Sequence, residues 1–121
     1  MSNHTARRIA GIFGFCGVLF GAFGAHMLHG LLQKNETTGI WETGVLYHLV
    51  HALALLTLSG WRPVPQRAFA LMLGGIMVFS GSLYLLSLTN IRWLGAITPI
   101  GGVSFLVGWG CLGLCPRGVS A

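Results

Sequence analysis

Charged side chains are scarce in this chain of 121 residues. They make up 7% of the sequence, whereas about a quarter of the residues of a typical soluble protein are charged. Hydrophobic residues account for 54%. So few charges cannot provide the polar surface that a water-soluble protein needs, so the composition excludes an ordinary soluble globular protein.

Acidic residues are the rarest charged group. Glu36 and Glu42 stand against seven Lys and Arg, which gives a formal net charge of +5. In a soluble protein this balance would suggest a nucleic-acid partner. Here the basic residues flank long apolar runs, where they set membrane topology and contact anionic lipids. We therefore expect membrane lipids as partners and no nucleic acid.

Cysteines and catalytic motifs are also few. The three cysteines, Cys16, Cys111 and Cys115, lie within apolar runs, and an odd number of such thiols argues against a disulfide framework. The sequence has no nucleophile elbow, phosphate-binding loop, dinucleotide-binding fingerprint or His-Glu-x-x-His motif. We expect the cysteines to pack as small apolar residues, and we expect neither a cofactor nor an enzyme activity.

Four long apolar runs dominate the sequence, at residues 9–29, 44–60, 68–88 and 93–115. A helix needs about 20 apolar residues to cross a bilayer. The runs are continuously apolar, which favours helices over the alternating pattern of a membrane barrel. Arg7 and Arg8 before the first run would also fit a signal peptide, but three further runs favour a membrane span. We predict an all-α protein, a compact four-helix transmembrane bundle forming one domain over residues 1–121.

Basic residues divide unevenly between the two sides of these runs. Five lie on the side of the N-terminus (Arg7, Arg8, Arg62, Arg67 and Arg117), and Lys34 and Arg92 lie on the other. Loops rich in Lys and Arg stay in the cytoplasm. The distribution predicts that both termini are cytoplasmic.

Glycines recur at helical spacing in three of the runs. Small residues let helices approach closely within a membrane, where association depends on packing rather than on the hydrophobic effect. We expect helix packing at Gly14, Gly17, Gly21, Gly24, Gly74, Gly81, Gly101 and Gly102. Whether the stripe in the first run faces its own bundle or a partner stays open. Pro99 lies inside the fourth run and predicts a kink there.

Polar residues gather in the non-cytoplasmic half of the predicted bundle. Ionisable groups are unfavourable inside a membrane and need an explanation. One polar cluster is expected from His26, Tyr47, His48, His51, Ser80, Ser82, Tyr84 and Thr98, with Glu42 near its mouth. It either fixes helix register through hydrogen bonds or binds a small ligand. His48 and His51 have the spacing of two metal ligands, but the runs lack a carboxylate at that depth, so we predict no metal site.

Four motifs carry a family resemblance: residues 21–26 (GAFGAH), 47–55 (YHLVHALAL), 79–84 (FSGSLY) and 98–109 (TPIGGVSFLVGW). In this order they resemble the YgdD-like family of small bacterial membrane proteins, domain of unknown function 423, whose eukaryotic relatives are called transmembrane protein 256. The resemblance implies a compact helical fold in the bacterial inner membrane and no established activity. It also implies histidine at His26 and His51, and often glutamine at the position of His48.

Two functional hypotheses follow. In the first, the chain binds or passes a small ligand, an ion or a lipid headgroup through the polar cluster. In the second, it is a structural accessory subunit or assembly factor of a larger membrane complex, which suits its short loops. The sequence does not decide whether the chain forms a homo-oligomer or joins a larger membrane complex.

Overall fold

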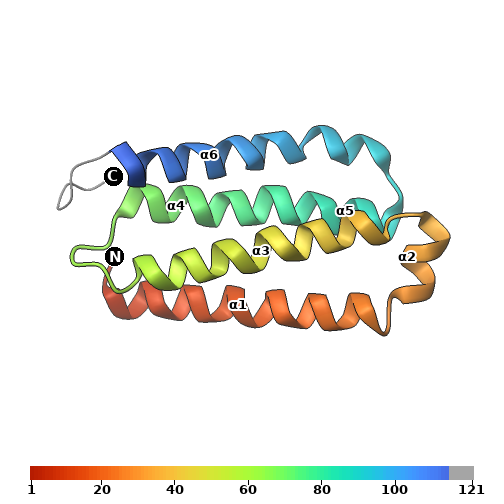
Figure 1. Ribbon diagram of the computed structural model, residues 1–121, viewed down its shortest axis with the longest axis horizontal. Helices are drawn as coiled ribbons and strands as arrows, with labels where there is room; N and C mark the ends of the chain where they lie inside the picture. Colours follow the sequence, from red (N-terminus) through yellow and green to blue (C-terminus); the bar gives the residue numbers. More distant parts are fainter. Residues whose placement is uncertain (115–121) are drawn as a thin grey trace.

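The computed structural model describes residues 1–114, and every regular element in that range is a helix (Figure 1). Four helical stretches are long and apolar enough to cross a membrane: Asn3–Ala25, Thr38–Leu58, Gln66–Thr89 and Arg92–Leu114. The prediction of an all-α protein with four membrane-spanning helices is confirmed.

The first span is α1 (Asn3–Ala25) and the second is α3 (Thr38–Leu58). The third is composed of α4 (Gln66–Gly75), the π-helix η1 (Ile76–Ser80) and α5 (Gly81–Thr89), and the fourth of the 3₁₀-helix η2 (Arg92–Ala96) and α6 (Thr98–Leu114). A short helix, α2 (His29–Asn35), connects α1 to α3 across one end of the molecule (Figure 1).

The helix limits differ from the predicted runs because hydropathy marks apolar residues and not hydrogen bonding. α1 begins at Asn3, six residues before the run, since Ser2 caps it by accepting a hydrogen bond from the Thr5 amide at 3.1 Å. His29 lies outside α1 and begins α2. α3 begins at Thr38, because Glu42 and Thr43 interrupt the apolar run but not the helix. Cys115 and Arg117 lie outside the described residues.

Pro99 does not kink the middle of a helix. It is the second residue of α6, which follows η2 after Ile97. Proline is tolerated in the first turn because the amide it lacks has no partner there. The prediction of a kinked fourth helix is therefore wrong, and the span is instead divided between η2 and α6.

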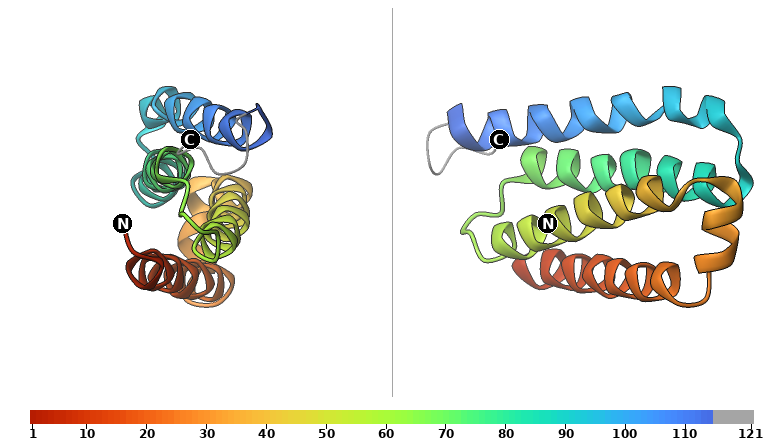
Figure 2. Two further views of the ribbon diagram at one scale, coloured as in Figure 1. Left: turned by 90° about the vertical axis from the view of Figure 1, so that its left-hand side faces the viewer. Right: turned by 45° about the vertical axis from the view of Figure 1, so that its right-hand side comes forward.

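The spans are arranged as a zigzag row rather than as a closed bundle. α1 packs on α3, α3 packs on α4, η1 and α5, and α6 packs on α4 and η1. In end view, α1 and α6 lie at opposite ends of the row (Figure 2). In the most apolar 18-residue stretch of each span, the buried share is 17% in each of the two outer spans, 39% in the second span and 44% in the third. The outer helices therefore turn most of their surface outward.

The apolar core lies at the end that carries the N-terminus and the α3–α4 connection (Figure 1). Its buried members are Ala6, Ala10, Leu55, Leu58, Val64, Ala68, Phe69, Met72, Ile76 and Phe105. Asn3 closes this end by donating hydrogen bonds to the carbonyls of Ser59 and Trp61, at 2.7 and 2.8 Å. The polar contacts between helices lie mainly farther along the row, toward α2.

Three glycines of the predicted stripe in α1 face α3. A Cβ added at Gly17 would lie 2.7 Å from Leu49, at Gly21 it would lie 3.2 Å from Val45, and at Gly24 it would lie 2.0 Å from Trp41. Gly14 has nothing within 4 Å of such an atom. The C-terminal part of the stripe, from Gly17 to Gly24, thus packs against α3 within the molecule's own row of helices.

The other predicted glycines divide in the same way. A Cβ at Gly101 would lie 2.3 Å from the Phe79 backbone nitrogen, whereas at Gly102 and Gly74 the nearest atoms are at 3.8 and 4.0 Å, and at Gly81 there is nothing within 4 Å. Further close approaches are Gly44 against Tyr84, Gly75 against Phe105, and Gly108 against Leu71 and Met72.

Candidate functional site

His48 joins three helices. Its Nε2 lies 2.8 Å from the Phe13 carbonyl oxygen of α1, and its Nδ1 lies 2.8 Å from the Tyr84 hydroxyl of α5. A carbonyl oxygen only accepts, so Nε2 carries the hydrogen, and in a neutral ring Nδ1 then accepts from the hydroxyl. This histidine–tyrosine link uses both ring nitrogens of a neutral imidazole and fixes α3 against α1 and α5.

Aromatic rings enclose the histidine–tyrosine link. Tyr84 packs edge-on against Phe20 at a centroid distance of 5.0 Å and lies 4.7 Å from the Trp41 ring. Trp41 is buried, and its Nε1 donates to the Phe20 carbonyl at 3.0 Å. Gly24 leaves space for the indole against α1, since a Cβ at this glycine would lie 2.0 Å from the Trp41 ring nitrogen. Trp61, by contrast, is exposed.

His51 forms a separate link to the opposite end of the row. Its Nδ1 lies 2.8 Å from the Tyr47 carbonyl, one turn earlier in α3, and its Nε2 lies 3.0 Å from the Trp109 Nε1 of α6. Since the indole nitrogen only donates, Nε2 accepts and Nδ1 carries the hydrogen. The ring also stacks on Phe105 at 3.6 Å. This histidine–tryptophan link holds α3 to α6, although these helices are not neighbours in the row.

The serines and threonine join further pairs of helices. Ser80 in η1 donates to the Gly44 carbonyl of α3 at 2.7 Å, and the Ser82 and Thr98 hydroxyls lie 2.6 Å apart between α5 and α6. Ser104 donates to the Leu71 carbonyl at 2.7 Å, which joins α6 to α4. Within residues 1–114, no buried side-chain nitrogen or oxygen lacks a hydrogen-bond partner.

The predicted polar residues therefore meet at several places and not at one. His48, Tyr84 and Ser80 hold α3 against α1, η1 and α5, whereas His51 bonds to Trp109 of α6 and the Tyr47 ring lies 4.6 Å from the Phe79 ring of η1. His26 lies apart from all of them, exposed at the C-terminal cap of α1. The part of the chain that the structure describes contains no group of three His, Cys, Asp or Glu arranged to hold a metal ion.

Several residues in these links were not predicted. Trp109 and Phe105 lie within the fourth family motif, but they were not predicted as site residues because aromatic residues are ordinary in an apolar helix. At the α2 end, the Asn35 side chain and the buried Thr37 hydroxyl donate to the Ser87 carbonyl at 3.0 and 2.9 Å. The only available signal was the Asn-Glu-Thr-Thr sequence, which is rich in residues that cap helices.

A groove opens where α1, α2 and α3 meet. It encloses about 520 Å³, a volume within the usual range of ligand sites. This α1–α3 groove is lined by Gly21, Gly24, Ala25, His29, Leu32, Thr38, Trp41, Glu42, Val45, Leu46 and Leu49. Of these, only Glu42 and His29 are ionisable.

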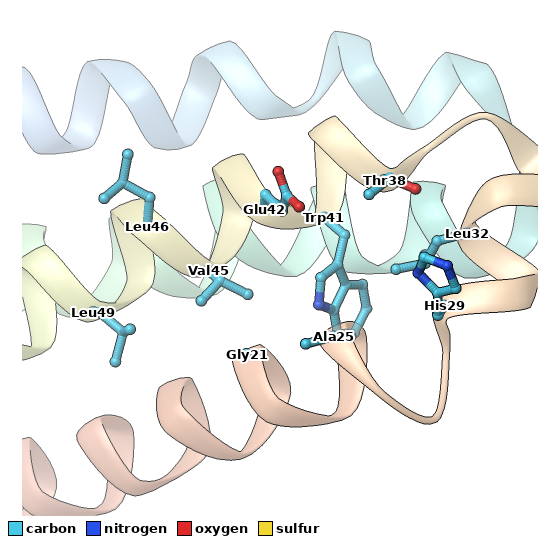
Figure 3. Close-up of a pocket in the computed structure, with 11 residues that line it drawn as sticks. Gly21, Ala25, His29, Leu32, Thr38, Trp41, Glu42, Val45, Leu46 and Leu49 are labelled. Carbon is cyan, nitrogen blue, oxygen red and sulfur yellow. The ribbon is translucent and has the colours of Figure 1, made fainter.

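Polarity changes along the α1–α3 groove. Along α3, Leu49, Leu46 and Val45 are followed by Glu42 and Thr38 toward α2, which carries His29. Val45 and Leu49 point toward α1, whereas Leu46 and Glu42 lie on the other edge of α3 (Figure 3). From Leu49 to Thr38 this wall is about 16 Å long at a rise of roughly 1.5 Å per residue. The groove is thus apolar at one end and polar at the other.

Two other grooves lie along α1, and their linings are more uniformly apolar. One, of about 420 Å³, runs between α1 and α3 from Ala10 to Leu56. The other, of about 210 Å³, lies between α1 and the third span and reaches His48 and Tyr84. Neither of them is lined by a carboxylate.

Comparison with known proteins identifies relatives along most of the chain. A family described as "Protein of unknown function (DUF423)" matches residues 20–102. The UPF0382 inner membrane protein YgdD of Escherichia coli (strain K12) is 40% identical, with 99% of this chain and 98% of that protein aligned. The UPF0382 membrane protein YwdK of Bacillus subtilis (strain 168) is 49% identical over 74% of this chain and 76% of its own length.

No solved structure matches the chain. The helical spans and these relatives support the same conclusion as the motifs in the sequence: the chain belongs to the DUF423 family of membrane proteins.

Proposed function

We propose that this chain is a non-enzymatic membrane protein that binds a membrane lipid in the α1–α3 groove. The observation that carries the proposal is the gradient of polarity along the groove, from Leu49 to Glu42 and His29 (Figure 3). A groove on a membrane span opens toward lipid, and its two ends correspond to an acyl chain and a headgroup.

The polar links support binding in the groove rather than transport through the row of helices. His48 and His51 use both ring nitrogens for protein partners, and Ser80 donates to a main-chain carbonyl. Passage of an ion requires polar groups that can exchange protein partners for the ion. Groups that hold helices together are better suited to keeping the groove walls in place.

The proposal places both termini in the cytoplasm. Arg7, Arg8, Arg62 and Arg67 lie at the end of the molecule that carries the N-terminus and the α3–α4 connection, while Lys34 and Arg92 lie at the α2 end (Figure 1). The positive-inside rule then puts the polar end of the groove on the non-cytoplasmic side. A reporter active only in the cytoplasm should function at the N-terminus and fail when inserted next to Glu36.

Lipid retention tests the proposal directly. The purified protein is released from nanodiscs of mixed phospholipids, and bound lipid is counted by native mass spectrometry. Ala25→Phe should lose the retained lipid because the new ring fills the groove at an exposed position. Ala22→Phe is the matched control, exposed on the same helix but outside the lining. Equal retention by both variants would contradict the proposal.

The second candidate is a structural accessory subunit or assembly factor, which the outward apolar face of α6 favours. Leu106 and Val103 are 72% and 57% exposed there. The glycines that were candidates for docking, Gly17, Gly21 and Gly24, instead face α3. The same mass spectra decide between the two functions, since a stoichiometric protein partner released from native membranes would support the accessory role.

A further inference from the structure

We infer that the α1–α3 groove selects lipids whose headgroup carries a protonated amine, and that the Glu42 carboxylate recognises this amine. The inference rests on the proposed lipid-binding function and adds the chemical class of the headgroup.

Glu42 lies at the boundary between the apolar and polar parts of the groove. It is four residues after Thr38, so it lies about 6 Å along α3 from the first residue of that span. Val45 and Leu46, the next residues of the lining along α3, begin the apolar wall (Figure 3). A headgroup whose acyl chain lies on that wall would bring its polar atoms to the depth of Glu42.

The groove supplies no fixed positive charge for this carboxylate. Its lining contains no lysine or arginine, and His29 is its one basic residue. The basic side chains at the same end are outside the lining: Lys34 is exposed on α2, and Arg92 donates to the Asn35 carbonyl at 2.8 Å. Glu42 is therefore placed to pair with a cation that comes from outside the chain.

A carboxylate at the edge of the membrane hydrocarbon attracts a cation more strongly than a carboxylate in water does. The attraction between two charges grows as the local dielectric constant falls, and an unpaired charge near the membrane interior is unfavourable. An ammonium group also donates hydrogen bonds to the carboxylate. A phospholipid with a phosphate but no amine would bring its negative charge close to Glu42 and would be disfavoured.

Competition between two phospholipids with the same acyl chains tests the inference. The protein is reconstituted in nanodiscs with equal amounts of phosphatidylethanolamine and phosphatidylglycerol, and retained lipids are identified by native mass spectrometry. The natural chain should retain the ethanolamine lipid in about fivefold excess, the scale of one partly exposed charge pair. Glu42→Gln should reduce this excess to about equal retention without lowering the total lipid bound.

Glu36→Gln is the matched control, because it removes the same charge outside the groove and should keep the excess. The inference is overturned if the natural chain retains the two lipids equally, or if Glu42→Gln keeps the preference while total retention is normal. In both cases lipid binding itself stands. If the natural chain retains no lipid at all, the proposed function fails as well.

Discussion

At the scale of single residues, two histidines three positions apart are held in opposite tautomers. His48 carries its hydrogen on Nε2, opposite the Phe13 carbonyl, whereas His51 carries its hydrogen on Nδ1, opposite the Tyr47 carbonyl. The sequence places both on one face of one helix, one turn apart. It does not show which acceptor each ring meets, because that depends on the helices packed on either side of α3.

Nitrogen-15 NMR of the histidine rings tests this difference. In the natural chain, the His48 signals should report the Nε2-H tautomer and the His51 signals the Nδ1-H tautomer, because each carbonyl acceptor fixes the hydrogen opposite it. Trp109→Phe should shift only the His51 signals, since the indole donor belongs to that ring. Two histidines in the same tautomer would contradict the structure.

Two neighbouring glycines in α6 provide a second test at this scale. Gly101→Ala should lower the free energy of unfolding by about 1–3 kcal/mol, a typical penalty for overpacking, because the added Cβ would meet the Phe79 backbone at 2.3 Å. Gly102→Ala is the control, since its nearest neighbour would be at an ordinary 3.8 Å. Unfolding in mixed detergent micelles, followed by tryptophan fluorescence, measures both. Equal effects would show that α6 does not approach η1 as described.

At the scale of elements, long helices were predictable and short or irregular ones were not. The four spans follow from continuous apolar runs, since a spanning backbone must satisfy its own hydrogen bonds. α2 has seven residues and no apolar run to mark it, and the π-helix η1 differs from an α-helix only in hydrogen bonding. Pro99 indicated an interruption, but whether it breaks or begins a helix depends on the neighbouring turns.

The contact of the α2 end with α5 should depend on Thr37. Its buried hydroxyl donates to the Ser87 carbonyl at 2.9 Å. Thr37→Val keeps the shape and removes the donor, which should cost about 1 kcal/mol and speed amide hydrogen exchange in α2 about fivefold. Thr43→Val is the control, because the Thr43 hydroxyl bonds within its own helix to Gly39. Unchanged exchange in α2 would contradict a role for this contact.

At the scale of the whole molecule, the zigzag row explains why one predicted polar cluster became several links. A closed bundle would bring Tyr84 and Thr98 toward a shared centre. In the row, α3 faces α1 and α5 on one side and reaches α6 on the other, so His48 and His51 lie in different contacts. Residue spacing fixes angles around one helix, but the order of helices in the membrane depends on all their contacts together.

The row also creates the concave surface on which the proposed function depends. α1 lies at one end of the row and packs mainly on α3, and the α1–α3 groove between them reaches α2. The sequence predicted Glu42 near the mouth of a polar cluster. It did not show that the site is a groove, because Gly21, Gly24 and Ala25 contribute space rather than chemical groups.

The most direct test of lipid binding in the α1–α3 groove is photo-crosslinking with a phospholipid that carries a diazirine in its acyl chain, followed by peptide mapping. A lipid bound in this groove should give crosslinks concentrated on Val45, Leu46 and Leu49, reduced by Ala25→Phe and not by Ala22→Phe. Leu106 of α6 is more exposed than Leu46, 72% against 60%. Crosslinks that simply follow exposure, with Leu106 ahead of Leu46, would contradict a bound lipid.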